Sequence, residues 1–165
     1  MALPKVETPK YSVMLPSTGK EIQFRPFLVK EEKVLLMAAE SQDQKQYITA
    51  MMDVVNECTF KALNINRLPT FDVEYLFVQI RAKGIGESVT LEGTCSECGH
   101  KQEVKLNLET VTIDKVSENL EDTFEVGSGI KIKVRPMRFI DSTSVAEINI
   151  TELIGKMIDT IYDDE

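Results

Sequence analysis

The sequence has one histidine, three cysteines and no tryptophan, and its apolar residues form no long run. With a single histidine, no convincing Ser/His/Asp or Cys/His nucleophile arrangement can be assembled. It contains no Walker phosphate loop and no Gly-x-Gly-x-x-Gly turn, and no apolar stretch approaches the roughly 20 residues of a membrane-spanning helix. These absences predict a protein that is not an enzyme, has no catalytic residues and acts by contact.

Positive charge is also scarce. Lysine and arginine number 19 against 27 aspartate and glutamate residues, which gives a net charge of −8. Because an acidic surface repels phosphate groups and anionic lipids, the sequence predicts no nucleic acid and no membrane as partner. The cysteine number is odd, and the N-terminus lacks the apolar segment of a signal peptide. Both features predict a reducing compartment, the cytoplasm.

The hydrophobic patterns predict an α+β protein with β-hairpins at both ends and a central zinc-ribbon-like hairpin packed with a helical bundle. Three parts are expected. Residues 1–86 hold an N-terminal hairpin and three helices, residues 87–109 hold the zinc-ribbon-like Cys-x-x-Cys hairpin, and residues 110–165 hold a C-terminal hairpin and an amphipathic helix.

In the N-terminal part, strands Tyr11–Leu15 and Glu21–Arg25 are expected to pair, and Pro26 to end the second strand. A helix should follow over Phe27–Glu40, with Glu31 and Glu32 as solvated acids in its first turn. Its apolar stripe is predicted to be Leu28, Leu35, Leu36 and Ala39.

A second helix is expected from about Asp43 to Phe60, and a third after Thr70, its predicted N-cap. The second helix carries apolar residues at i, i+3, i+4, i+7 and i+10, so Cys58 is interpreted as a buried core residue in preference to a metal ligand. The inward positions are expected to be Ile48, Met51, Met52, Val55 and Cys58, followed by Val73, Leu76, Phe77 and Ile80.

The C-terminal part should begin with a polar connecting strand and loop over Thr110–Asp122. A hairpin of Phe124–Val126 and Ile130–Val134 is expected next. Ser144 with Glu147 fits a capping box, and Ile150–Ile161 has the pattern of an amphipathic helix. The apolar face of that helix either closes the core or docks a partner helix.

The stretch with the clearest chemistry is Ser88–Leu108. Apolar and polar residues alternate on both sides of Cys95-Ser-Glu-Cys98-Gly99-His100, which predicts two paired strands with one buried face. A Cys-x-x-Cys turn followed by glycine has the shape of a zinc knuckle, because the tight turn brings two thiolates to one metal. Cys95 and Cys98 are therefore the candidate ligands of a structural zinc ion, the one cofactor the sequence suggests.

Structural zinc takes four ligands, and the knuckle supplies two. Three alternatives stay open: Cys58 and His100 complete a Cys3His site, a second knuckle comes from another chain, or the hairpin holds no metal. A thioredoxin-like redox pair is disfavoured, because that motif begins a helix whereas strands flank this one.

One short segment recurs. The same pattern of a strand, Arg-Pro and then an apolar residue occurs in Ile22–Phe27 and in Ile132–Met137. The two copies are 110 residues apart, as Arg25 and Arg135 are. Either this likeness is chance or the chain has two hairpin–helix halves.

Several distinctive stretches carry a resemblance to a known family: Phe24–Lys33, Asp53–Thr59, Leu68–Phe77 and Gln79–Lys83. Over most of residues 1–140 the sequence resembles the baseplate hub subunit and baseplate hub assembly proteins of T4-like tailed bacteriophages. The resemblance implies a non-enzymatic role, with other baseplate hub proteins as partners. It implies a location in the host cytoplasm during assembly and in the virion tail baseplate, and it leaves open whether the protein is a hub subunit or an assembly chaperone. Relatives continue with a further C-terminal segment, in some cases with a second Cys-x-x-Cys.

The candidate contact surfaces are the Arg25–Phe27 segment, the acidic surface and the C-terminal apolar helix. The alternative function is a zinc-ribbon regulatory module that binds nucleic acid or a polymerase. The acidic balance and the lack of a basic face with interleaved aromatic residues disfavour that alternative.

Overall fold

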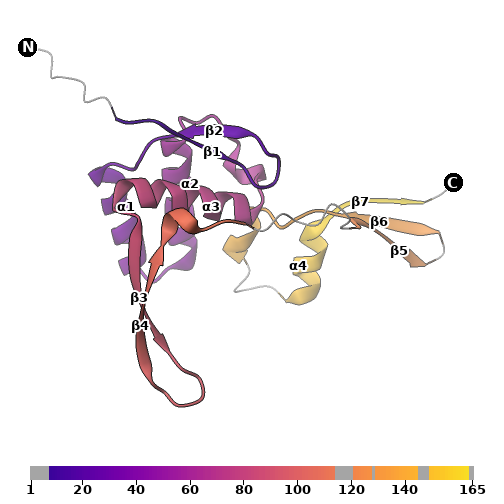
Figure 1. Ribbon diagram of the computed structural model, residues 1–165. Coiled ribbons are helices and arrows are strands. Elements are labelled where there is room, and N and C mark those ends of the chain that lie inside the picture. The colour runs from indigo at the N-terminus through magenta and orange to yellow at the C-terminus, as the bar shows by residue number, and fades with distance from the viewer. Residues whose placement is uncertain (1–7, 114–120, 128, 145–148, 164–165) are drawn as a thin grey trace, which may run out of the picture.

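The computed structural model describes residues 8–113, 121–127, 129–144 and 149–163, and shows an α+β protein (Figure 1). Its antiparallel strands form two hairpins and a three-stranded sheet. The strands are β1 (Tyr11–Met14), β2 (Glu21–Phe24), β3 (Ser88–Thr94), β4 (Lys101–Asn107), β5 (Thr123–Gly127), β6 (Ile130–Val134) and β7 (Ile158–Asp163). The helices are α1 (Val29–Glu40), α2 (Gln44–Cys58), α3 (Thr70–Gly84) and α4 (Ile150–Met157), with short 3-10 turns at Ile65–Arg67, Leu108–Thr110 and Phe139–Ser144.

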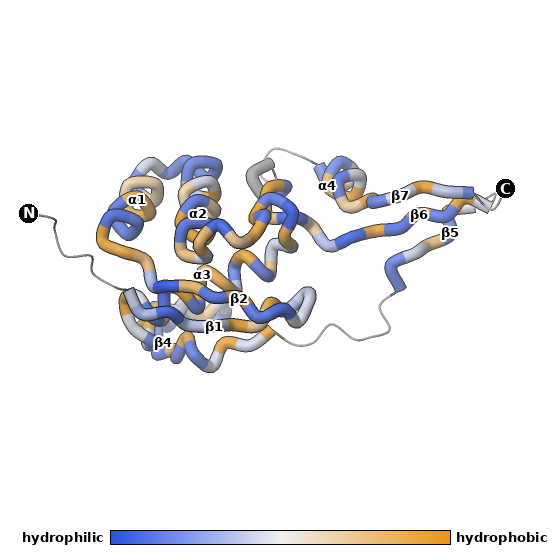
Figure 2. The backbone as a smooth tube through the Cα atoms, turned by 90° about the horizontal axis from the view of Figure 1, so that it is seen from above, coloured by the Kyte–Doolittle hydropathy of each residue, from blue (hydrophilic) through white to orange (hydrophobic). Residues whose placement is uncertain are grey.

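The main core lies where the β1–β2 hairpin packs on α1, α2 and α3 (Figure 2). The expected strands are confirmed, and so is the apolar face of α2, because Ile48, Met52 and Val55 are buried there. Val73, Leu76 and Ile80 of α3 are completely buried. The β1–β2 hairpin, α2 and α3 therefore form as their hydrophobic patterns predict.

The face of α1 that packs on the core is not the predicted one. Leu35 is buried as expected, but Leu28, Leu36 and Ala39 are exposed. The buried positions are Glu31, Leu35 and Ala38, spaced i, i+4 and i+7. The buried pairing of Glu31 with Arg25 turns the acid inward, so the apolar neighbours of Glu31 on that face become the core residues.

The start of α3 also differs from the prediction. Pro69 is the N-cap, and Thr70 is the first helical residue. The Thr70 hydroxyl donates to the carbonyl oxygen of Met137 at 3.1 Å, so it ties α3 to the C-terminal part of the chain.

The β3–β4 hairpin projects away from the helices (Figure 1). The predicted pairing of its two strands is confirmed, with Val89 opposite Leu106 and Leu91 opposite Val104. The expectation of a buried face and of packing with the helical bundle is wrong, however, since Leu91, Val104 and Leu106 are 49%, 41% and 43% exposed. The hairpin contacts the rest of the protein at its base, where the Leu108 N–H donates to the Glu87 carbonyl and Lys83 pairs with Glu109.

The C-terminal part contains the predicted β5–β6 hairpin, but the helix expected over Ile150–Ile161 ends at Met157. The next residues form β7, which pairs with the free edge of β6 and sets Ile161 opposite Ile132. β-Branched side chains at Ile158, Thr160 and Ile161 favour a strand there. The helix α4 has no buried residue, so the interpretation that its face closes the core is wrong.

Two other expectations concern undescribed positions. The expected capping box cannot be compared, because Glu147 and the Ser144 side chain lie outside the described residues. In the connection over Thr110–Asp122, residues 114–120 also lie outside the described residues. The described residues of this connection form no strand.

The recurring Arg-Pro segment makes the same contacts in both places. Arg25 donates to the Pro26 carbonyl and pairs with Glu31, six residues on; Arg135 donates to the Pro136 carbonyl and pairs with Asp141, also six residues on. The backbone N–H of each arginine donates to the last residue of a helix, Cys58 in α2 or Met157 in α4. The two segments are structurally equivalent, which favours the interpretation of two related halves.

Candidate functional site

The tip of the β3–β4 hairpin is the Cys95–His100 turn for which the sequence predicts a zinc knuckle. The Cys95 N–H donates to the His100 carbonyl at 2.9 Å, and the Gly99 N–H donates back to the Cys95 carbonyl at 3.0 Å. Gly99 has a φ of 69°, the left-handed conformation for which the sequence places glycine at this position. The turn thus carries Cys95 and Cys98 at one tip, where both cysteines are exposed and neither forms a disulfide.

Hydrogen bonds converge on the sulfur of Cys95. The backbone N–H groups of Cys98 and Glu97 and the Cys98 thiol all donate to it, and they hold the pKa of the Cys95 thiol below its ordinary value. A thiolate at this position is therefore stabilised by the turn itself, as expected of a metal ligand or a reactive thiol.

Cys58 is not part of this site. It is completely buried as the last residue of α2, where the Arg25 Nη1 donates to its sulfur at 3.6 Å. Burial raises the pKa of the Cys58 thiol to about 12, so it remains protonated and acts as a core residue, as its apolar face predicts. Among the residues whose placement is described, no three His, Cys, Asp or Glu side chains lie together as a possible metal site. The structure brings Cys95, Cys98 and His100 to one tip and leaves Cys58 in the core.

A buried ion pair anchors the start of α1. Arg25 Nη2 lies 2.8 Å from Glu31 Oε1, and Arg25 Nη1 donates to Glu31 Oε2 at 3.0 Å. The Leu28 N–H also donates to Oε2 at 2.6 Å. Burial alone would raise the pKa of Glu31, but these hydrogen bonds hold it below its ordinary value.

The assignment of Glu31 as a solvated surface acid is therefore wrong, and so is that of Arg25–Phe27 as a contact surface, because Arg25 and Phe27 are buried. The available signal was the recurring Arg-Pro segment, in which an acid follows each arginine by six residues.

A second buried acid was not foreseen. Asp72 of α3 is completely buried. It accepts hydrogen bonds from the Ser17 N–H, at 3.0 Å, and from the Ser17 hydroxyl. The pair fixes the β1–β2 turn on α3, so its role is structural.

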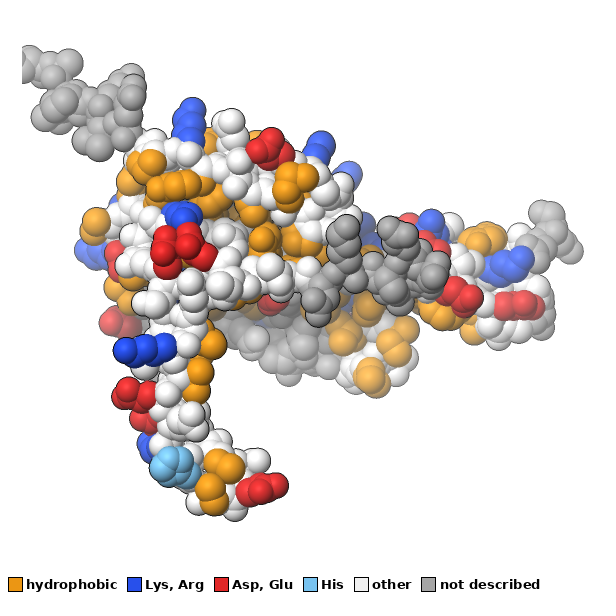
Figure 3. All heavy atoms as spheres, in the orientation of Figure 1, with side chains coloured by type: hydrophobic (Ala, Val, Ile, Leu, Met, Phe, Trp, Pro, Cys, Tyr) orange, Lys and Arg blue, Asp and Glu red, His pale blue; other side chains and the backbone are white. Residues whose placement is uncertain are grey.

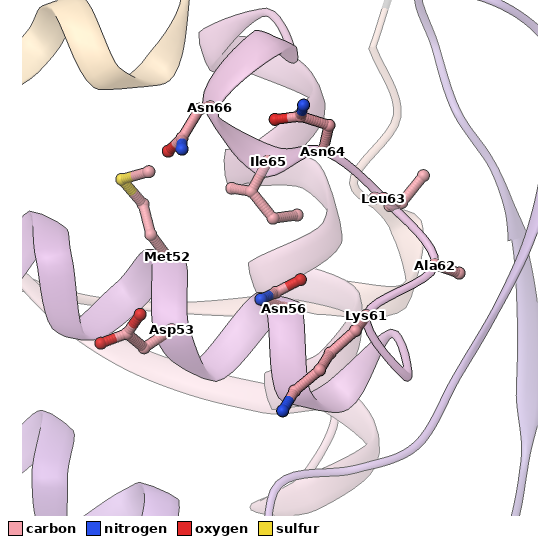
Figure 4. A pocket seen from close by; sticks show the side chains of 9 residues that line it. All are labelled: Met52, Asp53, Asn56, Lys61, Ala62, Leu63, Asn64, Ile65 and Asn66. Carbon is pink, nitrogen blue, oxygen red and sulfur yellow. The ribbon is translucent and has the colours of Figure 1, made fainter.

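A groove of about 510 Å³ lies between the end of α2 and the loop that follows it (Figure 4). Its described lining contains amides, one lysine and one carboxylate, with no histidine or cysteine, and Lys61 is paired with Glu57 at 2.8 Å. Among the described helices, none is long and apolar enough to cross a membrane.

Large apolar side chains are exposed on several elements (Figure 3). On α1, Val29, Leu36 and Met37 are 81%, 59% and 60% exposed. Their spacing of i, i+7 and i+8 places them on one helix face. On α4, Ile150 and Ile154 are exposed as well. Apolar surface of this kind is typical of protein–protein interaction sites.

Comparison with known proteins gives one match. The family model for the T4 bacteriophage base plate protein matches residues 8–165, nearly the whole chain. Comparisons with curated proteins and with solved structures found no match. The chain, with its helical core, projecting hairpin and C-terminal sheet, belongs to the family of T4 bacteriophage base plate proteins.

Proposed function

We propose that this protein is a non-enzymatic component of the baseplate hub that acts through contacts with other hub proteins. Membership of the base plate family supports a role in the baseplate. The assignment to the hub rests on the resemblance of Phe24–Lys33 and the other distinctive stretches to hub proteins. We expect a hub component to be located in the virion tail.

The outer face of α1 is the observation that supports action by contact. Val29, Leu36 and Met37 of α1 are exposed to solvent. The opposite face of the helix, with Leu35 and Ala38, is buried in the core. Next to them, Val34 and Met37 line a shallow groove of about 510 Å³ between α1 and α2, whose lining is mainly apolar. Burial of these side chains against a partner would be favourable by about 25 cal/mol per Å² of apolar surface.

The experiment places a charge on this face in the phage that encodes the chain. A Leu36→Glu, Met37→Glu double variant should fold, since both positions are exposed, and yet fail to support tail assembly. Gln44→Glu, at an exposed polar position at the start of α2, is the matched control and should assemble tails normally. Electron microscopy of lysates counts complete tails. Normal assembly by the folded double variant would refute the assignment of this face as a hub contact.

A further inference from the structure

Two independent features meet on the β3–β4 hairpin: a pair of exposed thiols at its tip and an uncovered apolar row along its length. We propose that two copies of this chain pair through these hairpins and share one structural zinc ion, bound by Cys95 and Cys98 of each copy. The proposal does not depend on the role in the baseplate.

The tip is suited to bind metal but supplies half of a site. The turn closed by the Cys95 N–H bond to the His100 carbonyl and the Gly99 N–H bond to the Cys95 carbonyl presents the exposed Cys95 and Cys98 thiols at one tip. Structural zinc is tetrahedral with four protein ligands, so two ligands have to come from elsewhere.

The chain's third cysteine does not supply one of them. Cys58 is completely buried as the last residue of α2, and the β3–β4 hairpin projects away from the helices (Figure 1). Among the described residues, no third His, Cys, Asp or Glu side chain joins the two thiols. A second copy of the chain brings another pair of thiols on an equivalent turn, which makes four.

The apolar row identifies the surface on which the second copy would pack. Val89 pairs with Leu106 and Leu91 with Val104, all on one face of the hairpin. The ladder continues to Cys95 through the Cys95 N–H bond to the His100 carbonyl, so Cys95 extends the row to the tip. Two hairpins packed face to face about a twofold axis along their length would bury both rows and bring both tips together.

The charges on the hairpin are compatible with this pairing. Glu92 forms an ion pair with Lys101 at 2.7 Å, and Glu92 lies opposite Glu103. By strand alternation these residues and Lys105 lie on the face opposite the apolar row. In the described hairpin, the apolar face carries no charged side chain, so pairing buries no unpaired charge.

The test uses the purified full chain in a thiol-reducing buffer, with zinc alone as the added ligand. Native mass spectrometry should show a dimer with one zinc ion, and a chelator should return it to the monomer. Cobalt(II) in place of zinc should give the absorption of a tetrahedral thiolate site. One zinc ion per monomer, or a monomer that binds no zinc, would overturn the proposal.

Variants distinguish the contribution of the metal site to dimer formation from that of the apolar row. Cys95→Ser with Cys98→Ser should abolish zinc binding and the dimer while circular dichroism stays unchanged, because both residues are exposed. Ser96→Ala, at the same tip, is the matched control and should bind zinc normally. His100→Asn should also bind zinc normally, and loss of zinc there would indicate a Cys3His-type site and contradict the four-thiolate site.

Leu91→Thr with Leu106→Thr should leave the tip intact and raise the dissociation constant of the zinc-bound dimer by about tenfold or more. An unchanged constant would show that the rows do not pack together and would overturn the pairing.

Discussion

The pair of Arg25 and Glu31 allows the sharpest test of the fold. Replacing Glu31 with glutamine removes the carboxylate that neutralises Arg25, whose side chain is 11% exposed. It also weakens the acceptor of the Leu28 N–H at the start of α1. A buried charge left without its partner costs about 3–5 kcal/mol, so we expect Glu31→Gln to lower the free energy of unfolding by roughly 3 kcal/mol.

The equivalent pair provides an internal comparison. Arg135 and Asp141 are 20% and 17% exposed and 3.5 Å apart, against 2.8 Å for Arg25 and Glu31. Because it is longer and better solvated, we expect Asp141→Asn to cost about 1 kcal/mol or less. Glu32→Gln, next to Glu31 on the same helix turn, is the control and should be within about 0.5 kcal/mol of the wild type.

Urea denaturation followed by circular dichroism at 222 nm, a helix-sensitive wavelength, measures these differences. In a thermal scan, about 3 kcal/mol corresponds to a loss of roughly 6–12 °C in Tm for a chain of this size. The reasoning would be refuted if Glu31→Gln and Glu32→Gln had the same stability, because Glu31 would then be the solvated surface acid that its sequence position suggests.

Three further predictions follow from the same structure. The pKa of Glu31 lies below its ordinary value of 4.5. The ionised Glu31 side chain therefore stabilises the fold fully above about pH 4.5, and this stabilisation is lost as the pH falls through the folded-state pKa. Acid unfolding of Glu31→Gln should consequently depend less on pH than that of the wild type. Leu35→Ala should cost about 2–5 kcal/mol and Leu36→Ala less than about 0.5 kcal/mol in urea titrations, because only Leu35 is buried, and equal effects would contradict the orientation of α1. A thiol reagent should label the two exposed hairpin cysteines of the native protein and label Cys58 only after denaturation, because burial raises the pKa of Cys58 to about 12.

The sequence predicted best those elements whose pattern depends on local spacing. The i, i+4, i+7 and i+10 positions of α2 are buried and Met51 at i+3 is partly buried, and β1 and β2 pair as expected. For α1, the spacing of leucines indicated a helix but not which side faces the core. That side is set by the ion pair of Glu31 with Arg25, a tertiary contact that a count of apolar residues treats as surface charge.

The hairpin shows a different limit. Period-two alternation from Val89 to Leu106 correctly indicated paired strands, but the face it predicted to be buried is exposed, because alternation does not say what covers a face. Near the C-terminus, the spaced apolar residues from Ile150 to Ile161 indicated one helix, but the last of them lie in β7. The outcome there depends on Arg135, whose N–H and Nη2 bind the Met157 and Lys156 carbonyls, and on the open edge of β6. Both contacts join residues distant in sequence.

The turn of the candidate site and the burial of Cys58 agree with the sequence analysis, whereas metal binding at Cys95 and Cys98 stays a prediction. Cys95, Cys98 and Gly99 form the knuckle turn that their spacing indicates, and the apolar face of α2 correctly placed Cys58 in the core.

The central claim is that this base plate family protein is a component of the hub. Quantitative mass spectrometry of purified virions of the phage that encodes the chain tests it most directly. We expect a few copies per particle, together with the other hub proteins. Absence from particles but association with hub precursors in infected cells would identify an assembly chaperone instead of a subunit. Absence from every tail protein fraction would contradict the account.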